Sequence, residues 1–239
     1  MNSARHREEV SKMDLLNIDF SPLVTTLKTA IVVTIIAFGL GMLMARWVLK
    51  ANRTIQIVVD TIMTLPMVLP PTVIGFFLLI LFSRKRPLGI FLEDYFGIQV
   101  VQTWAGCILA AFCIAFPLMY KNAKSAFEQL DWNLIFAART LGMSEWNIFW
   151  KIIFPLSGPG IGSGTVLTFA RAMGEYGATV MIAGNIPGKT ATISQKIAVF
   201  VKDGDYQSAS VQVLIVMGIA AMILLLMNGF AKNTFRQKL

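Results

Sequence analysis

Five long apolar runs divide the chain, and each is long enough to cross a membrane as a helix. The hydrocarbon core of a bilayer is about 30 Å thick, which an α-helix crosses with about 20 residues. The runs are approximately Leu23–Val48, Ile55–Phe82, Trp104–Tyr120, Gly160–Ala183 and Ala209–Phe230. The pattern predicts an all-α polytopic membrane protein with five transmembrane helices, or six if Ile55–Phe82 folds as a hairpin at its prolines.

The segment Phe136–Pro155, between the third and fourth runs, is too polar to be a span. Its charged and amide side chains are Arg139, Glu145, Asn147 and Lys151. We expect two short helices at a membrane surface, the first with Asp131 as its N-cap and Gly142 at the position that ends it. Ser144 is the expected N-cap of the second helix, and Pro155 is expected to stop the surface segment.

The second apolar run contains one acidic residue and three prolines. Asp60 lies within it, and Pro66, Pro70 and Pro71 follow within six residues. Each proline lacks an N–H donor and restricts the residue before it, so a regular helix cannot continue here. Broken backbone at membrane depth is tolerated only where protein or a water-filled cavity covers it. The run therefore predicts a bent segment near a subunit interface or pore; the alternative is a re-entrant or interfacial turn of purely structural use.

The fourth run carries two opposite charges. Arg171 and Glu175 are four residues apart and lie on one helical face. They form either a structural ion pair or a site in which Arg171 lies beside a path for anions. The candidate translocation-path residues are thus Pro66, Pro70, Pro71, Arg171 and Glu175. In the same run, Gly160 and Gly164 predict a face where another helix packs closely.

Two further features argue against an enzyme. The triplet Gly188-Lys189-Thr190 imitates the end of a phosphate-binding loop, but Ala183 stands where that motif needs its first glycine. We interpret the triplet as an external turn. The only histidine is His6, and Cys107 and Cys113 are six apart in an apolar run, a spacing typical of neither a metal site nor a disulfide. The sequence predicts no catalytic, cofactor-binding or metal-binding residues.

Composition agrees with a membrane protein. Hydrophobic residues make up 56% of the 239 positions and charged residues only 14%, whereas soluble domains have about 25% charged residues. The net charge of +8 is better explained by basic ends and loops beside membrane lipid than by nucleic acid, because no basic stripe with interleaved aromatic residues occurs. Residues 1–20 are polar and lack the apolar core of a cleavable signal.

The pattern of the surface segment resembles the signature loop of ABC-importer permease subunits. The matching positions are Ala137, Ala138, Gly142, Ile152 or Ile153, and Pro155. Phe136 and Phe154 depart from it, since the family usually has Glu and Leu there. The strings TLPMVLPPTVIG, from Thr64, and FARAMGEYGATVMIAGNIPGKT, from Phe169, are similar to those of the molybdate type within the sulfate and molybdate permeases. The resemblance covers about residues 20 to 232.

This resemblance implies a transmembrane domain at 21–232, with a polar leader at 1–20 and a basic cytoplasmic tail at 233–239. The loop at about 131–155 would hold the cytoplasmic coupling helix, with Ala137, Ala138, Gly142 and Pro155 as ATPase-coupling residues. Two copies of the chain would form the pore, two ATP-binding cassette subunits would supply ATP hydrolysis, and an extracellular protein would deliver the oxyanion. This chain itself would bind no cofactor. It would lie in the plasma membrane of a prokaryote. If the chain has five spans and the coupling loop is cytoplasmic, its N-terminus would be outside and its C-terminus in the cytoplasm.

Three alternatives remain open at this point. The substrate could be sulfate, thiosulfate or tungstate in place of molybdate. The chain could be a membrane scaffold that transports nothing, although a scaffold has no need of irregular backbone in the membrane. It could be a self-contained secondary carrier, but such carriers have paired broken helices, and the sequence predicts a single strongly broken segment.

Overall fold

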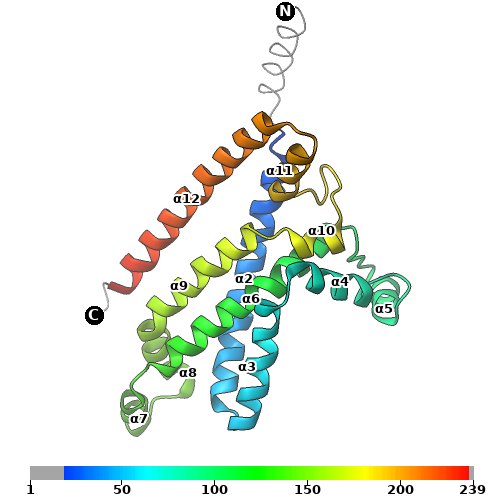
Figure 1. Ribbon diagram of the computed structural model, residues 1–239. Coiled ribbons are helices and arrows are strands. Elements are labelled where there is room, and N and C mark those ends of the chain that lie inside the picture. Colours follow the sequence, from blue (N-terminus) through cyan, green and yellow to red (C-terminus); the bar gives the residue numbers. More distant parts are fainter. Residues whose placement is uncertain (1–18, 237–239) are drawn as a thin grey trace, which may run out of the picture.

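The computed structural model describes residues 19–236, and all regular elements in that range are helices (Figure 1). The expected leader at 1–20 therefore lies almost entirely outside the described residues, as does the end of the tail at 237–239. The expected all-α class is confirmed for the part of the chain that the structure describes.

Within residues 19–236, four stretches of helix are long and apolar enough to cross a membrane, and a fifth crossing forms when one bent pair counts as a single span. The long helices are α2 (Ser21–Lys50), α6 (Trp104–Glu128), α9 (Phe154–Met173) and α12 (Tyr206–Arg236). The bent pair is α3 (Arg53–Val68) and α4 (Pro71–Leu81), which meet at 110°. Because α4 has 11 residues, it rises only about 17 Å, so the hairpin that would give a sixth span does not form.

Among the long helices, α2, α6 and α12 run toward one end of the molecule, and α9 runs in the opposite direction (Figure 1). Figure 1 shows α2 and α12 both running from the end near the described N-terminus to the opposite end, where α7 (Trp132–Thr140) and α8 (Glu145–Ile148) lie. Helix α9 returns between them, and α12 packs beside α9 through Ala220, Ile223 and Met227. Between the start of the first span and the α7–α8 segment the chain crosses three times, through α2, the bent pair of α3 and α4, and α6. The start of the first span and the α7–α8 segment therefore lie at opposite ends of the molecule.

Glycines set the closest helix contacts. A Cβ added at Gly160 would lie 2.6 Å from Ala126 Cβ, and one at Gly164 would lie 2.6 Å from Asn122 Cβ. Both contacts are between α9 and α6, so the packing face expected from the two glycines is confirmed. The third central helix follows the same rule, because a Cβ at Gly41 in α2 would lie 2.9 Å from Met119 Cγ in α6. Small residues here allow the backbones to approach.

Two expectations about the fourth span are wrong. Pro155 does not stop the surface segment: α8 continues through a π-helical turn, η1 (Phe149–Ile153), into α9, so that Glu145–Met173 is one continuous stretch. The π turn accommodates the proline, because the Phe154 N–H bonds to the Phe149 carbonyl and the wider turn needs no donor from Pro155. The predicted span Gly160–Ala183 is also not continuous, since α9 ends at Met173 and a new helix, α10 (Gly177–Ala183), follows.

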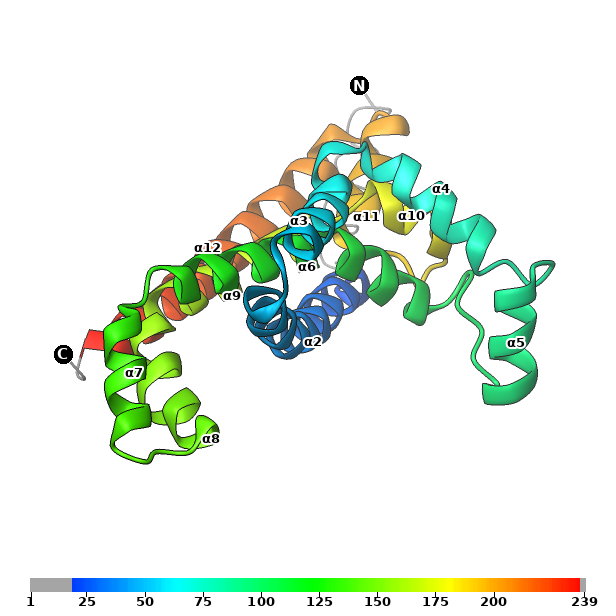
Figure 2. The ribbon, with the colours of Figure 1, turned by 90° about the horizontal axis from the view of Figure 1, so that it is seen from below.

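Shorter elements complete the chain at the end opposite α7 and α8. The segment between α4 and α6 contains a helix, α5 (Pro87–Phe96), which projects from one corner of the molecule while α7 and α8 form another (Figure 2). The segment Gly188-Lys189-Thr190 is a turn, as expected, in which the Ile186 carbonyl accepts hydrogen bonds from the N–H groups of Lys189 and Thr190. Helix α11 (Ile193–Lys202) then leads to α12.

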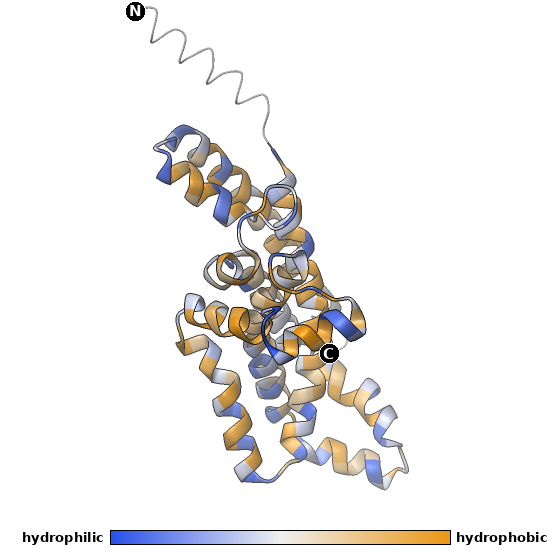
Figure 3. Cartoon of the chain, turned by 90° about the vertical axis from the view of Figure 1, so that its right-hand side faces the viewer, coloured by the Kyte–Doolittle hydropathy of each residue, from blue (hydrophilic) through white to orange (hydrophobic). Residues whose placement is uncertain are grey.

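The outer faces of the long helices are apolar. Figure 3 shows hydrophobic residues along the helices and hydrophilic residues gathered mainly toward their ends. On α12, Leu214 and Leu225 are 67% and 73% exposed. Contiguous exposed apolar surface of this kind marks contact with a membrane or a partner.

Candidate functional site

The segment from Asp131 to Ser144 has the helix ends that its sequence predicts. The Asn133 N–H donates to Asp131 Oδ1 at 2.9 Å, and the Asn147 N–H donates to Ser144 Oγ at 3.3 Å. Gly142 has φ +77°, a left-handed conformation that glycine adopts without strain. Each helix is therefore capped by its own residues, and the turn between them depends on a glycine.

The two short helices pack on each other through a small core. Ile135, Ala138 and Ile148 are buried against one another, which gives the small side chain of Ala138 a structural use inside the segment. Ala137 and Gly142, by contrast, are exposed. Leu141, beside the glycine turn, is 82% exposed. The segment thus presents an exposed surface made by Ala137, the turn at Gly142 and the side chain of Leu141.

An ion network ties this turn to the first span. Glu145 Oε1 accepts a hydrogen bond from Arg139 Nε at 2.6 Å, and Glu145 Oε2 lies 3.7 Å from Arg46 Nη2 in α2. The hydrogen bond to the Glu145 carboxylate raises the pKa of Arg139 above its ordinary value. The Arg46 guanidinium also lies 4.5 Å from the ring centre of Phe149. One carboxylate therefore joins α7, α8 and the end of α2.

An aromatic stack stiffens the junction with the fourth span. The ring of Trp146 contacts that of Trp150, and the rings of Phe149, Trp150 and Phe154 contact one another, with centroids 5.1–6.3 Å apart. These rings cover the π-helical turn, and π turns of this kind are frequent at functional sites. Because the helix continues without interruption to Met173, the segment after the turn at Gly142 and the far end of α9 belong to one continuous helix.

The expected break in the second run is confirmed, and the structure places it after Pro66. That proline lies inside α3, while the chain bends at Leu69 and Pro70, and Pro71 begins α4. Pro70 has an extended backbone and Pro71 needs no donor in the first helical turn. Pro66 is therefore part of the first arm of the bend, and Pro70 and Pro71 form its corner.

A second break, which the sequence reasoning missed, lies at the end of α9. Arg171 Nη1 and Glu175 Oε2 are 2.9 Å apart, so the predicted pair forms. Glu175 is 3% exposed, and its Oε1 accepts a hydrogen bond from the Ala178 N–H at 2.8 Å, which satisfies the first turn of α10. The available signal was the run Gly174-Glu175-Tyr176-Gly177, where two glycines flank a charge that can cap a new helix.

The two breaks meet. A Cβ added at Gly177 would lie 3.0 Å from Pro71 Cβ, and one at Gly75 would lie 2.7 Å from Ala178 Cα. The structure therefore brings Pro71 and the neighbourhood of Glu175 together, although they are about a hundred positions apart in the chain. It does not bring them to Ala137, Gly142 or Pro155, which lie at the end of the molecule that holds α7 and α8 (Figure 1). Coupling and path candidates form two separate sites joined by α9.

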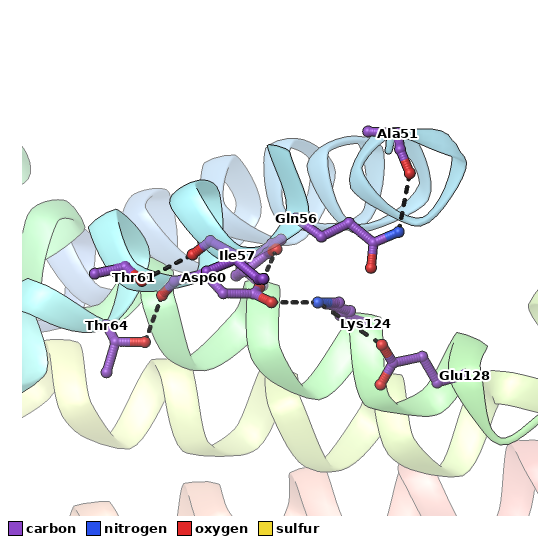
Figure 4. A network of polar contacts seen from close by, with 9 residues as sticks. Ala51, Gln56, Ile57, Asp60, Thr61, Thr64, Lys124 and Glu128 are labelled. Atoms are coloured by element: carbon purple, nitrogen blue, oxygen red, sulfur yellow. Dashed lines mark hydrogen bonds and ion pairs between the residues drawn. The ribbon is translucent and has the colours of Figure 1, made fainter. Parts of the chain in front are cut away.

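Asp60 is held by a polar network that only the fold reveals. Figure 4 shows its carboxylate facing Lys124 of α6, which also lies 3.7 Å from Glu128. The Tyr120 hydroxyl donates to Asp60 Oδ1 at 2.6 Å. Lys124 is 12% exposed. This network fastens α3, which buries none of its own residues, to the central bundle. A carboxylate within an apolar run indicates that a polar or charged side chain pairs with it, but the sequence does not identify that side chain as Lys124.

Several known membrane transport proteins are similar to this chain over most of its length. The profile of the family described as "Binding-protein-dependent transport system inner membrane component" matches residues 37–235. The "Putative molybdenum transport system permease protein YvgM" of Bacillus subtilis (strain 168) is 38% identical over 205 residues, covering 86% of this chain and 90% of that protein. The "Molybdenum transport system permease protein ModB" of Escherichia coli (strain K12) is 34% identical over 226 residues, covering 95% and 99%. The "Sulfate transport system permease protein CysT" of the same strain is 36% identical over 214 residues, covering 89% and 75%.

Solved structures share the fold at low sequence identity. A bacterial alginate ABC transporter in complex with an alginate pentasaccharide-bound periplasmic protein matches with a TM-score of 0.76 at 16% identity, covering 93% of this chain and 82% of that one. The MetNI methionine ABC transporter, in inward-facing conformations, matches with a TM-score of 0.68 at 15% identity, covering 89% and 94%.

Proposed function

This chain belongs to the family of binding-protein-dependent transport system inner membrane components, and from that premise we propose that it forms the membrane pathway of an ATP-driven molybdate importer. It is a multi-pass membrane permease subunit. Relatives named as molybdenum permeases match nearly the whole chain at 34–38% identity. Sulfate permeases match almost as well, and sulfate is the second candidate substrate because it is also a tetrahedral dianion.

The coupling role rests on one observation. The exposed turn at Gly142 continues, through α8 and η1, into the span that ends at Arg171 and Glu175. We propose that separate ATPase subunits bind this turn, with Ala137, Gly142 and the exposed Leu141 at the contact. Pro155 lies within the continuous helix just after the π-helical turn, and Ala138 maintains the shape of the turn from inside. A push on the turn then moves the break at the other end of α9.

The proposed path lies where the two broken spans meet. Pro70 and Pro71 bend the second span, Pro66 lies in the arm before the bend, and Gly177 packs against Pro71. Arg171 is about one-third exposed while its partner Glu175 is buried. A partly exposed cation beside irregular backbone can attract an oxyanion, and the buried carboxylate limits how tightly the anion is held. The paired breaks are also a feature of secondary carriers, so the dependence on ATP needs a direct test.

Topology and partners complete the proposal. The ATPase-binding turn is cytoplasmic, so the start of α2 is outside and the end of α12 is inside. Two copies of the chain enclose the path, and an extracellular binding protein delivers the anion to the end that carries α5 and α11. ATP is bound by the partner ATPase, and this chain carries no cofactor.

The test is uptake by the complete complex. Proteoliposomes that contain this chain, its ATPase and its binding protein should take up molybdate only when ATP is present on the side of the membrane where the ATPase lies. Excess sulfate should compete weakly with molybdate for uptake. Gly142→Glu should insert normally yet hydrolyse ATP without uptake, because a bulky charge in a left-handed turn prevents seating on the ATPase. Uptake without ATP would establish a carrier, uptake of sulfate alone would change the substrate, and normal uptake by Gly142→Glu would refute the coupling site.

A further inference from the structure

A small cavity separates the α7–α8 segment from the ends of the first and third spans. Its volume is about 50 Å³. Three cations line it, Arg46 and Lys50 from α2 and Arg139 from α7, against one carboxylate, Glu145. The lining therefore has two positive charges in excess. The rest of the wall is apolar and includes Leu49, Phe127, Leu130, Trp132, Ile135 and Ile153.

The existing ion pairs do not neutralise this cluster. Glu145 is already shared between Arg139 and Arg46. Among residues 19–236, Lys50 makes no ion pair with any carboxylate, although its charge is near enough to Glu145 to act on it. Clustered cations repel one another unless an anion lies among them. The arrangement is thus complementary to one additional negative group.

Size and position identify the class of that group. Drug-sized and nucleotide-sized ligands occupy pockets of about 300–1,000 Å³, so this cavity admits only a small headgroup such as a phosphate. The cavity lies at the last turn of α2 and beside the end of α6, where membrane spans end and phospholipid headgroups are concentrated. Trp132, at the wall, is 46% exposed, and tryptophans are enriched at this depth of a membrane. Basic pockets between spans on the cytoplasmic side bind anionic headgroups.

We propose that this cavity binds the phosphate headgroup of an anionic phospholipid, whose glycerol and acyl region stays outside the cavity. The headgroup bridges Lys50 and Arg46 of α2 to Arg139 of α7. It thereby adds a contact between the first span and the glycine turn, beside the one that Glu145 supplies. This proposal rests on the cytoplasmic placement of α7 and α8 in the proposed function, and it does not depend on which anion is transported.

The test measures lipid retention on the purified full-length protein in mild detergent. Phosphatidylglycerol, phosphatidylcholine or inorganic phosphate is added, and bound adducts are counted by native mass spectrometry. We expect phosphatidylglycerol to be retained in preference to phosphatidylcholine. Lys50→Gln should lower its retention about fivefold, which is the effect of one cation at a membrane surface, and Lys50→Arg should restore it.

The matched control is Arg53→Gln. Arg53 is exposed, lies three positions from Lys50 at the start of α3 and does not line the cavity, so its loss removes one cation from the same face without touching the site. Unchanged retention in this control supports the proposal. Equal losses in Lys50→Gln and Arg53→Gln would reduce the effect to general surface charge and overturn it. Retention of inorganic phosphate but not of phosphatidylglycerol would also overturn the lipid assignment.

Discussion

Replacing Gly160 by alanine tests whether close helix packing holds α9 against α6. The added Cβ would lie 2.6 Å from Ala126 Cβ, whereas carbon atoms pack best about 3.5–4.0 Å apart. The helices must therefore separate by roughly 1 Å or distort locally. Overpacking of this kind costs about 1–3 kcal/mol, which lowers Tm by several degrees in a chain of this size.

The partner substitution sharpens this test. Ala126→Gly alone should destabilise by about 1 kcal/mol, because glycine is a poor helix former. Combined with Gly160→Ala, it should recover most of the lost stability, since the methyl group has moved across the interface. Gly39→Ala is the control, because nothing lies within 4 Å of the added Cβ, and it should be neutral or stabilising. Thermal unfolding in detergent gives all four values, and strictly additive effects of the pair would refute the packing argument.

Two further predictions concern other sites. Gly142→Ala should destabilise the turn by about 1–2 kcal/mol because Gly142 has a positive φ, and Gly142→Asn should destabilise it less. The number of ATP molecules hydrolysed per anion transported should therefore rise from glycine to asparagine to alanine. The same ratio in all three proteins would contradict the proposed role of the turn. Lys124→Met removes the partner of Asp60, so it should lower the free energy of unfolding by about 1–2 kcal/mol in this partly exposed network, measured as a lower Tm. The double variant with Asp60→Asn should be more stable than Lys124→Met alone; no recovery would show that the network does not fasten α3.

Several features could be predicted from the sequence because they depend on neighbouring residues. The bend at Pro70 follows from missing donors, the caps at Asp131 and Ser144 from side chains that reach their own backbone, and the Arg171–Glu175 pair from helical spacing. The spans formed by α2, α6 and α12 follow from the length of apolar runs, whereas the bounds of the fourth span do not. Each is a local rule, satisfied within a few residues of the chain.

The sequence by itself therefore determined that the chain crosses a membrane several times, where it bends at prolines and where the glycine turn lies, but it left five and six spans open. Only the tertiary structure decided that Pro155 lies within a continuous helix, because a π-helical turn needs no N–H donor from the proline. Only the fold paired Asp60 with Lys124 and placed Gly177 against Pro71, since contacts between residues far apart in sequence depend on how whole helices pack. The separation of the glycine turn from the distant break, joined by one helix, is a property of that packing.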